Sequence, residues 1–210
     1  MELGIGEWAV ISVCAILILG YVRGYYYNRQ KAEQILAWLQ PGLEKLGKVE
    51  PGERLAGLAT GGRLQVKQAI EPFRRVEAIF ILAPRENLIF WLFHHLLGRN
   101  DELALKISLR TQPSTEIEVA RRGDREFARI VSGGEKKTFT RLSGLPKYEA
   151  AYRGKSNADQ LKTFLERYGK VVFRLSLRRE QQHLFVRAYL PHLQTKPAEA
   201  FITSLKALLE

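Results

Sequence analysis

The adjacent histidines His94 and His95 are the residues best suited to catalysis or metal binding, because imidazole ligates metals and transfers protons near neutral pH. Neighbouring residues on a helix point about 100° apart, however, so this pair cannot hold one ion from a single helix face. His183 and His192 have no such partner nearby, and the carboxylates are scattered among Lys and Arg. We therefore expect no catalytic residues, no metal site and no enzymatic activity.

The stretch from Gly133 to Thr138 is the nearest match to a phosphate-binding loop. It reads Gly-Gly-Glu-Lys-Lys-Thr, lacks the first glycine that the P-loop spacing requires, and follows no clear strand. The sequence also contains no dinucleotide-binding glycine pattern and no nucleophile elbow. We interpret the stretch as a plain turn and expect no cofactor and no small-molecule substrate.

Positive charge is the clearest indication of a partner. The chain has 33 Lys and Arg residues against 22 Asp and Glu, which gives a net charge of +11. Such an excess favours a polyanionic partner, either anionic lipid head groups or the phosphates of RNA. The candidate partner-binding residues are Arg74, Arg75, Arg121, Arg122, Arg125, Lys136 and Lys137.

An uninterrupted apolar segment, residues 8–22, precedes all of these basic residues. With Leu3 and Ile5 it reaches about 20 residues, the length that crosses a hydrocarbon core of ~30 Å. A cleaved signal peptide would begin with basic residues, whereas Glu2 and Glu7 precede this segment. We therefore predict a single transmembrane helix rather than a signal peptide or a buried helix of a globular domain.

The flanks of this segment predict its orientation. From Arg23 to Lys31 every charged residue is basic, so the positive-inside rule places residues 1–7 outside and the rest of the chain in the cytosol. Trp8 at one end and Tyr21 at the other are typical of aromatic residues at membrane interfaces. The membrane would be the plasma membrane of a prokaryote or the endoplasmic reticulum of a eukaryote.

Residues 23–50 are expected to continue as a juxtamembrane helical arm. Pro41 predicts a kink in this arm, Gly47 predicts its end, and residues 50–53 predict a turn. The apolar residues that recur at helical spacing are Ala32, Ile35, Leu36, Leu39, Leu43 and Leu46.

Residues 55–210 are expected to form the cytosolic domain. Strands broken by single helices favour an α+β domain with a mostly antiparallel sheet. The order strand, helix, strand, strand occurs in both halves, which leaves open whether the domain consists of two similar β-α-β-β halves. Alternating patterns predict strands at 63–69, 75–83, 103–109, 115–120, 148–152, 171–177 and 183–190. Helical patterns occur at 86–97, 156–169 and 198–209, with a short helix near 127–131.

The predicted helix at 86–97 is apolar nearly all round and too short to span a bilayer. It either packs on the sheet or presents an apolar face to the membrane or to another membrane protein. In the second case Trp91 and Phe93 would make the main contacts.

The order of these parts resembles the calumin family, the coiled-coil-domain subunit of the PAT complex that works beside the translocon of the endoplasmic reticulum. The resemblance covers roughly residues 20–190 and rests on order and spacing. The matching parts are Asn28-Arg29 and Ala37-Trp38 in the arm, the block 86–109, and the helix Phe164–Tyr168 leading into strand 171–177. It implies a non-enzymatic, chaperone-like role in the insertion of multipass membrane proteins, with the translocon, other membrane subunits and the ribosome or its rRNA as partners.

Two features of that family are missing from this sequence. These are a long acidic lumenal region linked to calcium binding and a long basic C-terminal coiled coil, so calcium binding is not carried over. We expect a compact prokaryotic relative, for example an archaeal one, acting as a membrane-anchored accessory factor of membrane-protein insertion. The alternatives are a bitopic structural component of a pilus or secretion platform and, with only the histidine pair behind it, a membrane-tethered enzyme.

Overall fold

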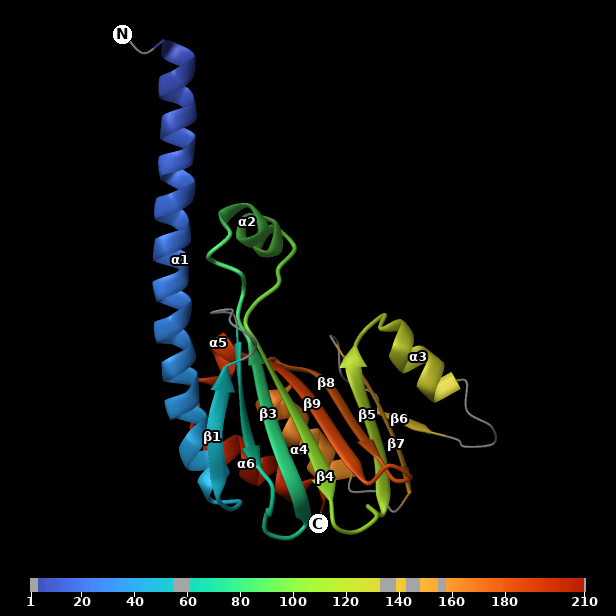
Figure 1. The fold of residues 1–210 in the computed structure, drawn as a ribbon. Coiled ribbons are helices and arrows are strands. Elements are labelled where there is room, and N and C mark those ends of the chain that lie inside the picture. Colours follow the sequence, from blue (N-terminus) through green and yellow to red (C-terminus); the bar gives the residue numbers. More distant parts are fainter. Residues whose placement is uncertain (1–3, 55–60, 133–138, 143–147, 155–157, 210) are drawn as a thin grey trace.

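The first element is a 40-residue helix, α1 (Ile5–Glu44), whose N-terminal part extends beyond the other elements (Figure 1). The structure is a computed structural model that describes residues 4–54, 61–132, 139–142, 148–154 and 158–209. The helix continues without a break from the predicted span into the predicted arm, as the sequence indicated. Pro41 lies in its last turns, and the helix ends at Glu44, just before Gly47, whose φ is 149°.

Within the described residues, nine strands form one sheet in the order β1-β2-β3-β4-β9-β8-β5-β7-β6, and every neighbouring pair is antiparallel. The strands are β1 (Val49–Arg54), β2 (Gly61–Val66), β3 (Phe73–Ile81), β4 (Glu102–Leu109), β5 (Thr115–Arg121), β6 (Thr140–Leu142), β7 (Tyr148–Gly154), β8 (Val172–Arg178) and β9 (His183–Tyr189). The other helices are α2 (Leu88–Leu96), α3 (Arg125–Ser132), α4 (Ala158–Tyr168), α5 (Leu190–Leu193) and α6 (Ala198–Ala207). The predicted α+β class with a mostly antiparallel sheet is confirmed.

Two strands differ from the sequence prediction. The turn predicted at residues 50–53 is wrong, because this stretch belongs to β1, an edge strand with a register shift between Glu50 and Glu53. An edge strand with such an irregularity accommodates Pro and Gly, which a central strand would not. The short strand β6 was not predicted, and the turn expected from Gly133 to Thr138 lies outside the described residues.

The two halves of the domain share an order of elements but differ in strand pairing. The strands β3 and β4, which flank α2, pair directly with each other. The strands β7 and β8, which flank α4, are separated by β5, which pairs with both. A repeat of two β-α-β-β units is therefore not visible in the pairing.

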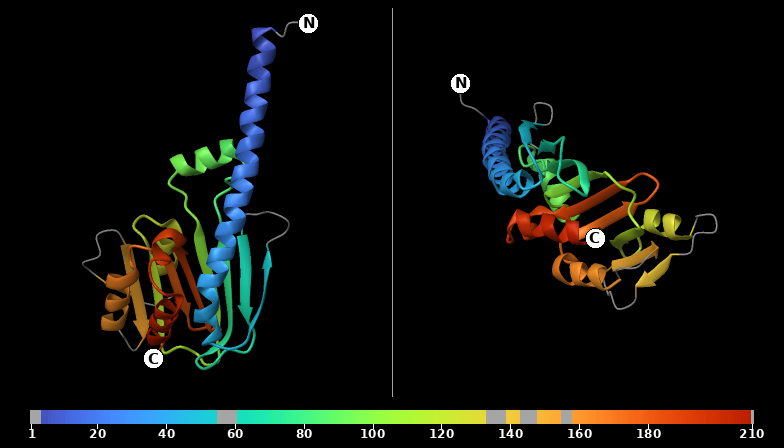
Figure 2. Two further views of the ribbon diagram at one scale, coloured as in Figure 1. Left: turned by 90° about the vertical axis from the view of Figure 1, so that its left-hand side faces the viewer. Right: turned by 90° about the horizontal axis from the view of Figure 1, so that it is seen from below.

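The main core lies on one face of the sheet, between the strands and a layer made of the lower half of α1, α4 and α6 (Figure 2). Its largest buried side chains include Ile35, Leu39, Phe73, Phe80, Leu105, Tyr168, Leu175 and Phe201. The rings of Tyr168 and Phe201 meet edge to face with their centroids 5.0 Å apart. The lower half of α1 is thus a core element as well as a continuation of the apolar segment.

The first and the last helix meet where the C-terminal part of α1 packs beside α6. Gly42 lies so close to Ala198 that an added Cβ would come within 3.0 Å of its backbone. The indole Nε1 of Trp38 donates a hydrogen bond to the carbonyl oxygen of Lys196 over 2.9 Å. The core therefore needs the first and the last helix together.

The helix α3 covers the opposite face of the sheet. Its Phe127 is fully buried against Ala120 and Ala151, whereas the neighbouring Val119 and Ala150 point into the main core. Because alternate residues of a strand point to opposite faces, these two clusters lie on opposite sides of the sheet.

Replacing Leu39, which is 2% exposed in the core, with Ala should lower the free energy of unfolding by about 2–5 kcal/mol, because a cavity forms. The matched change Leu17→Ala, at a side chain 42% exposed on the upper half of α1, should leave the domain's unfolding nearly unchanged. Urea unfolding of the full chain in detergent, followed by near-UV circular dichroism, measures both. Equal losses would contradict the division of α1 into an exposed and a core half.

Candidate functional site

The upper half of α1 is apolar and exposed. It contains a stretch of 18 residues with the apolar composition of a membrane span, and none of that stretch is buried against the rest of the protein. Ile16, Ile18 and Leu19 are each more than 60% exposed. The helix is therefore long and apolar enough to cross a membrane, and over this length it does not serve as a core helix.

The helix α2 is also apolar and exposed, and none of its residues is buried. It stands off the sheet on two connections, residues 82–87 and 97–101, and runs across α1 rather than along it (Figure 2). The interpretation that this helix packs on the sheet is therefore wrong. The side chains of Ile89, Phe90, Leu92, Phe93, Leu96 and Leu97 are each more than half exposed.

The two residues predicted to make the contacts of α2 differ in exposure. Phe93 is 62% exposed. Trp91 is half-buried and stacks on His95, with ring centroids 5.7 Å apart. No group of three or more His, Cys, Asp or Glu side chains that could hold a metal occurs among the described residues. The histidine pair thus lies in an apolar helix, where His95 supports an aromatic ring.

Two glycines bring the start of α2 against α1. A Cβ on Gly24 would collide with the carbonyl oxygen of Arg85, and one on Gly20 would collide with the side chain of Leu88. Since Gly20 lies within the apolar segment, the start of α2 lies level with the last turn of that segment.

A buried carboxylate, that of Asp101, joins the arm of α2 to α1. Its two oxygens accept hydrogen bonds from Nη1 and Nη2 of Arg85 at 2.9 and 3.0 Å, and Oδ2 pairs with Nζ of Lys31 at 2.6 Å. The backbone N–H of Ala83 donates to Oδ1 over 2.8 Å. Burial raises the pKa of Asp101, but these hydrogen bonds outweigh it and hold the pKa below its ordinary value.

The amide of Asn28, also fully buried, completes this contact. Its Nδ2 donates to the carbonyl oxygen of Ala83 over 2.9 Å and to Glu86 over 3.0 Å, and its Oδ1 accepts from Arg85 over 3.1 Å. We call Asn28, Lys31, Arg85 and Asp101 the Asp101 junction. Because Arg85 precedes α2 and Asp101 follows it, the junction fastens both connections of α2 to one turn of α1.

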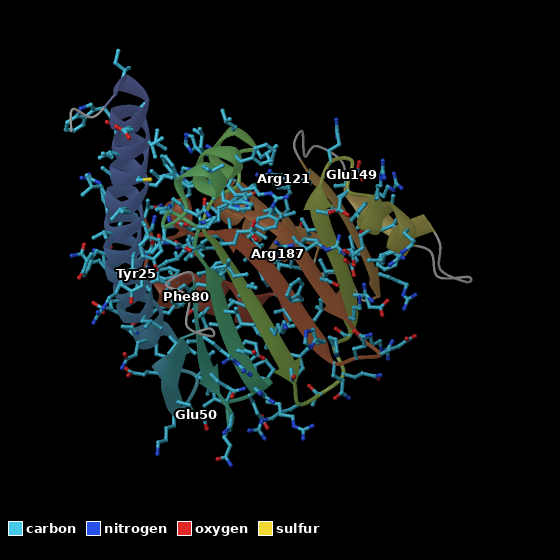
Figure 3. The ribbon with its side chains drawn as sticks, turned by 45° about the horizontal axis from the view of Figure 1, so that its top comes forward. Tyr25, Glu50, Phe80, Arg121, Glu149 and Arg187 are labelled. Atoms are coloured by element: carbon cyan, nitrogen blue, oxygen red, sulfur yellow. The ribbon has the colours of Figure 1, made fainter. Side chains whose placement is uncertain are left out.

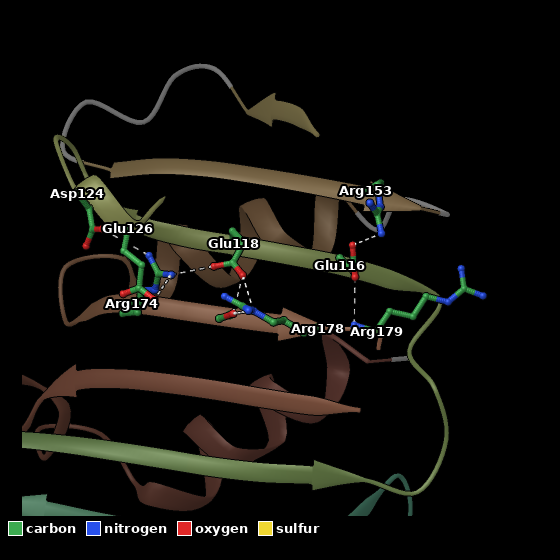
Figure 4. Close-up of polar contacts among 9 residues, drawn as sticks. Glu116, Glu118, Asp124, Glu126, Arg153, Arg174, Arg178 and Arg179 are labelled. Atoms are coloured by element: carbon green, nitrogen blue, oxygen red, sulfur yellow. Dashed lines mark hydrogen bonds and ion pairs between the residues drawn. The ribbon is translucent and has the colours of Figure 1, made fainter. Parts of the chain in front are cut away.

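A second buried ionic cluster lies on the sheet beside α3 (Figure 4). The carboxylate of Glu118 accepts a hydrogen bond from Ser176 Oγ over 2.6 Å and pairs with Arg174 at 3.2 Å and Arg178 at 3.4 Å. Burial raises the pKa of Glu118, and the hydroxyl and the two guanidinium groups offset only part of this effect. A cavity of about 170 Å³ adjoins the cluster. Because the charges pair with one another, we interpret the cluster as a structural link between β5 and β8.

The basic residues predicted to bind partners do not form one site. Arg74 and Arg75 lie exposed at the start of β3, at the end of the sheet away from α2. Arg121 and Arg122 lie exposed where β5 ends, and Arg125 lies exposed at the start of α3, at the end of the sheet toward α2. Lys136 and Lys137 lie outside the described residues.

Fold and surface together define a class of protein, an antiparallel α+β domain fastened through buried ion pairs to one helix long and apolar enough to cross a membrane. The chain matches no protein-family model, and no curated protein matches it in sequence.

Replacing Asp101 with Asn should lower the free energy of unfolding by about 3–5 kcal/mol, because it leaves Arg85 and Lys31 without their shared carboxylate. The adjacent change Glu102→Gln removes a partly exposed pair with Arg187 and should cost less than about 1 kcal/mol. Thermal unfolding in detergent gives both values. If Asp101→Asn lowers the free energy of unfolding no more than Glu102→Gln does, the Asp101 junction does not make the proposed contribution to stability.

The stability contributed by Asp101 should also depend on pH. Its pKa in the folded protein lies below the ordinary value of about 3.9, so the contribution is complete above that value and is lost as pH falls through the lower, folded pKa. The difference in Tm between the wild type and Asp101→Asn should therefore narrow below about pH 4. A difference that stays constant from pH 7 to pH 3 would rule this out.

Proposed function

We propose that the protein is a membrane-anchored accessory factor of membrane-protein insertion, with α1 as its span and the α+β domain in the cytosol. One observation carries the proposal, namely that the exposed apolar helix α2 is held across the exposed apolar half of α1. Exposed apolar surfaces of this extent mark sites that contact a membrane or another protein.

The position of α2 gives it a place in the membrane. If residues 8–22 cross the bilayer, α2 lies at the cytosolic end of the span, where Leu88 contacts Gly20. A short apolar helix that runs across a span lies in the plane of the interface, buried ~5–10 Å into the boundary between head groups and acyl chains. The two helices then form an apolar corner that opens toward the bilayer.

Such a corner suits a client or partner that is itself a transmembrane segment. An incompletely packed segment entering the cytosolic leaflet would meet apolar side chains on two sides, from α1 and from α2. This argument from geometry agrees with the resemblance to the calumin family, which supplies the translocon and its associated subunits as partners.

The ribosome is proposed as a partner at the opposite end of the domain. Arg74 and Arg75 lie there, together with Arg179 in the turn between β8 and β9, and all three are exposed. A basic surface that faces the cytosol below a membrane suits the phosphates of rRNA. This role involves no catalytic step, no cofactor and no small-molecule substrate.

The orientation can be tested with reporters fused after Glu210. A fluorescent protein at this position should be bright, and alkaline phosphatase inactive, because we expect the C-terminus in the cytosol. Active phosphatase would place the domain outside. That result would sink the insertion proposal and favour the pilus or secretion-platform alternative.

The corner can be tested by substitution. Changing both Phe93 and Leu96, which are 62% and 76% exposed, to Ser should reduce insertion of a multipass reporter protein several-fold in cells that depend on this gene. The control is Ile70→Ser, at a side chain 49% exposed in the β2–β3 turn at the far end of the domain.

The same positions can carry a photo-crosslinking residue. Phe93 should capture other membrane proteins, including translocon subunits, and Ile70 should not. Equal insertion in the two variants, together with the absence of any membrane-protein adduct from Phe93, would contradict the proposed role of the corner.

A further inference from the structure

The turn between β5 and α3, residues 121–125, faces the same way as α2 (Figure 1). The register of the sheet explains this. Glu102, which follows the arm of α2, pairs with Tyr189, Ala188 pairs with Val172 on the next strand, and Ala120 pairs with Arg174 beside it. The end of β5 therefore belongs to the edge of the sheet from which α2 rises.

The Asp101 junction gives the position of this edge relative to the proposed membrane span. Lys31 pairs with Asp101, which immediately precedes β4, so the edge of the sheet lies level with Lys31 on α1. Lys31 lies about 12 Å beyond Arg23 along the helix axis, at ~1.5 Å per residue. Head groups extend ~5–7 Å beyond the hydrocarbon core on each side, so side chains that rise from this edge reach the head-group layer.

Aromatic rings and guanidinium groups are stacked at this edge. The rings of Phe173 and Tyr189 lie 4.5 Å apart between centroids. The guanidinium of Arg121 lies 4.8 Å from the ring of Tyr189, and that of Arg187 lies 4.9 Å from the ring of Phe173 (Figure 3). Arg121 also donates a hydrogen bond to Tyr148, whose pKa burial raises. Stacking on aromatic rings fixes the position of Arg121 and leaves N–H donors free for an anion.

The arginines of the turn lack carboxylate partners. Among the described residues no acid lies within ion-pair distance of Arg121, Arg122 or Arg125. The nearest acids along the chain, Asp124 and Glu126, lie 3.7 and 3.8 Å from Arg174 instead. The three exposed arginines outnumber the two acids of this turn, Asp124 and Glu126, which share Arg174 with Glu118, so the turn carries a net positive charge.

We propose that Arg121, Arg122 and Arg125, supported by the stacked rings of Phe173 and Tyr189, bind the phosphate groups of anionic lipids in the cytosolic leaflet. The inference rests on the proposed span and gives the domain a second point of contact with the membrane, across the sheet from α2. Basic and aromatic side chains at head-group depth are the usual composition of such contacts. RNA is less well placed, because it would have to enter the space between this edge and the bilayer.

Native mass spectrometry of the full chain released from nanodiscs tests the proposal. The discs contain either phosphatidylcholine alone or phosphatidylcholine with phosphatidylglycerol, and retained lipid is counted. The variant carries Arg121→Gln, Arg122→Gln and Arg125→Gln, and the matched control carries Arg74→Gln, Arg75→Gln and Arg179→Gln. The first should weaken retention of phosphatidylglycerol at least about fivefold, and the control should retain it like the wild type.

Each other outcome overturns the inference. Equal losses in the two variants would indicate a general charge effect, and retention unchanged in the first variant would remove the site. RNA that copurifies with the wild type and is lost from the first variant alone would show that the turn at residues 121–125 binds nucleic acid instead of lipid. A wild-type chain that fails to enter the discs would instead refute the span, and thus the proposed function itself, which keeps the two failures distinct.

Discussion

The buried carboxylate of Asp101 is the contact on which the arrangement of the apolar helices depends. A carboxylate with no access to water is costly unless charged and hydrogen-bonded partners surround it, and Asp101 has Arg85, Lys31 and a backbone N–H. These partners come from α1 and from the chain just before α2, so the energetic requirement of one side chain fixes two helices. Mispositioning either helix would leave a buried charge unpaired.

This requirement separates the molecule into a rigid frame and an apolar surface. The frame consists of the sheet, the helices behind it and the lower half of α1, all sharing one core. The surface consists of the upper half of α1 and the whole of α2, neither of which buries side chains in that core. Because α1 is one continuous helix, it sets the depth of the domain relative to its own apolar half, and the ion pairs and hydrogen bonds of the junction hold α2 at a fixed level beside it.

Local patterns in the sequence predicted most of the elements. The alternation of apolar and polar residues, as at Val76, Ala78 and Phe80, predicted β3 and β4. The helical spacing of apolar residues predicted that α1 continues through the arm. Residues 50–53 were mispredicted because Pro51 and Gly52 favour turns in isolation, whereas pairing with β2 makes them part of an edge strand.

The contacts of the candidate site could not be predicted from the sequence, because they join residues that lie far apart in it. Asn28 meets Ala83, and Lys31 meets Asp101, with no local motif at any of them. Arg74 and Arg121 lie far apart because the antiparallel sheet places β5 beside β8. The spacing of residues along the chain does not predict this strand order. The exposure of α2 likewise depends on where its connections leave the sheet.

The pairing of α1 with α6 has a consequence for how the protein is made. Trp38 bonds to the backbone of Lys196, and Gly42 packs on Ala198, so the core closes only after nearly the whole chain has been synthesised. The apolar N-terminal segment leaves the ribosome long before that. On the proposed topology this segment is already embedded in lipid while the strands emerge from the ribosome. The domain then completes its folding next to the membrane, because the lower half of the same helix is part of its core.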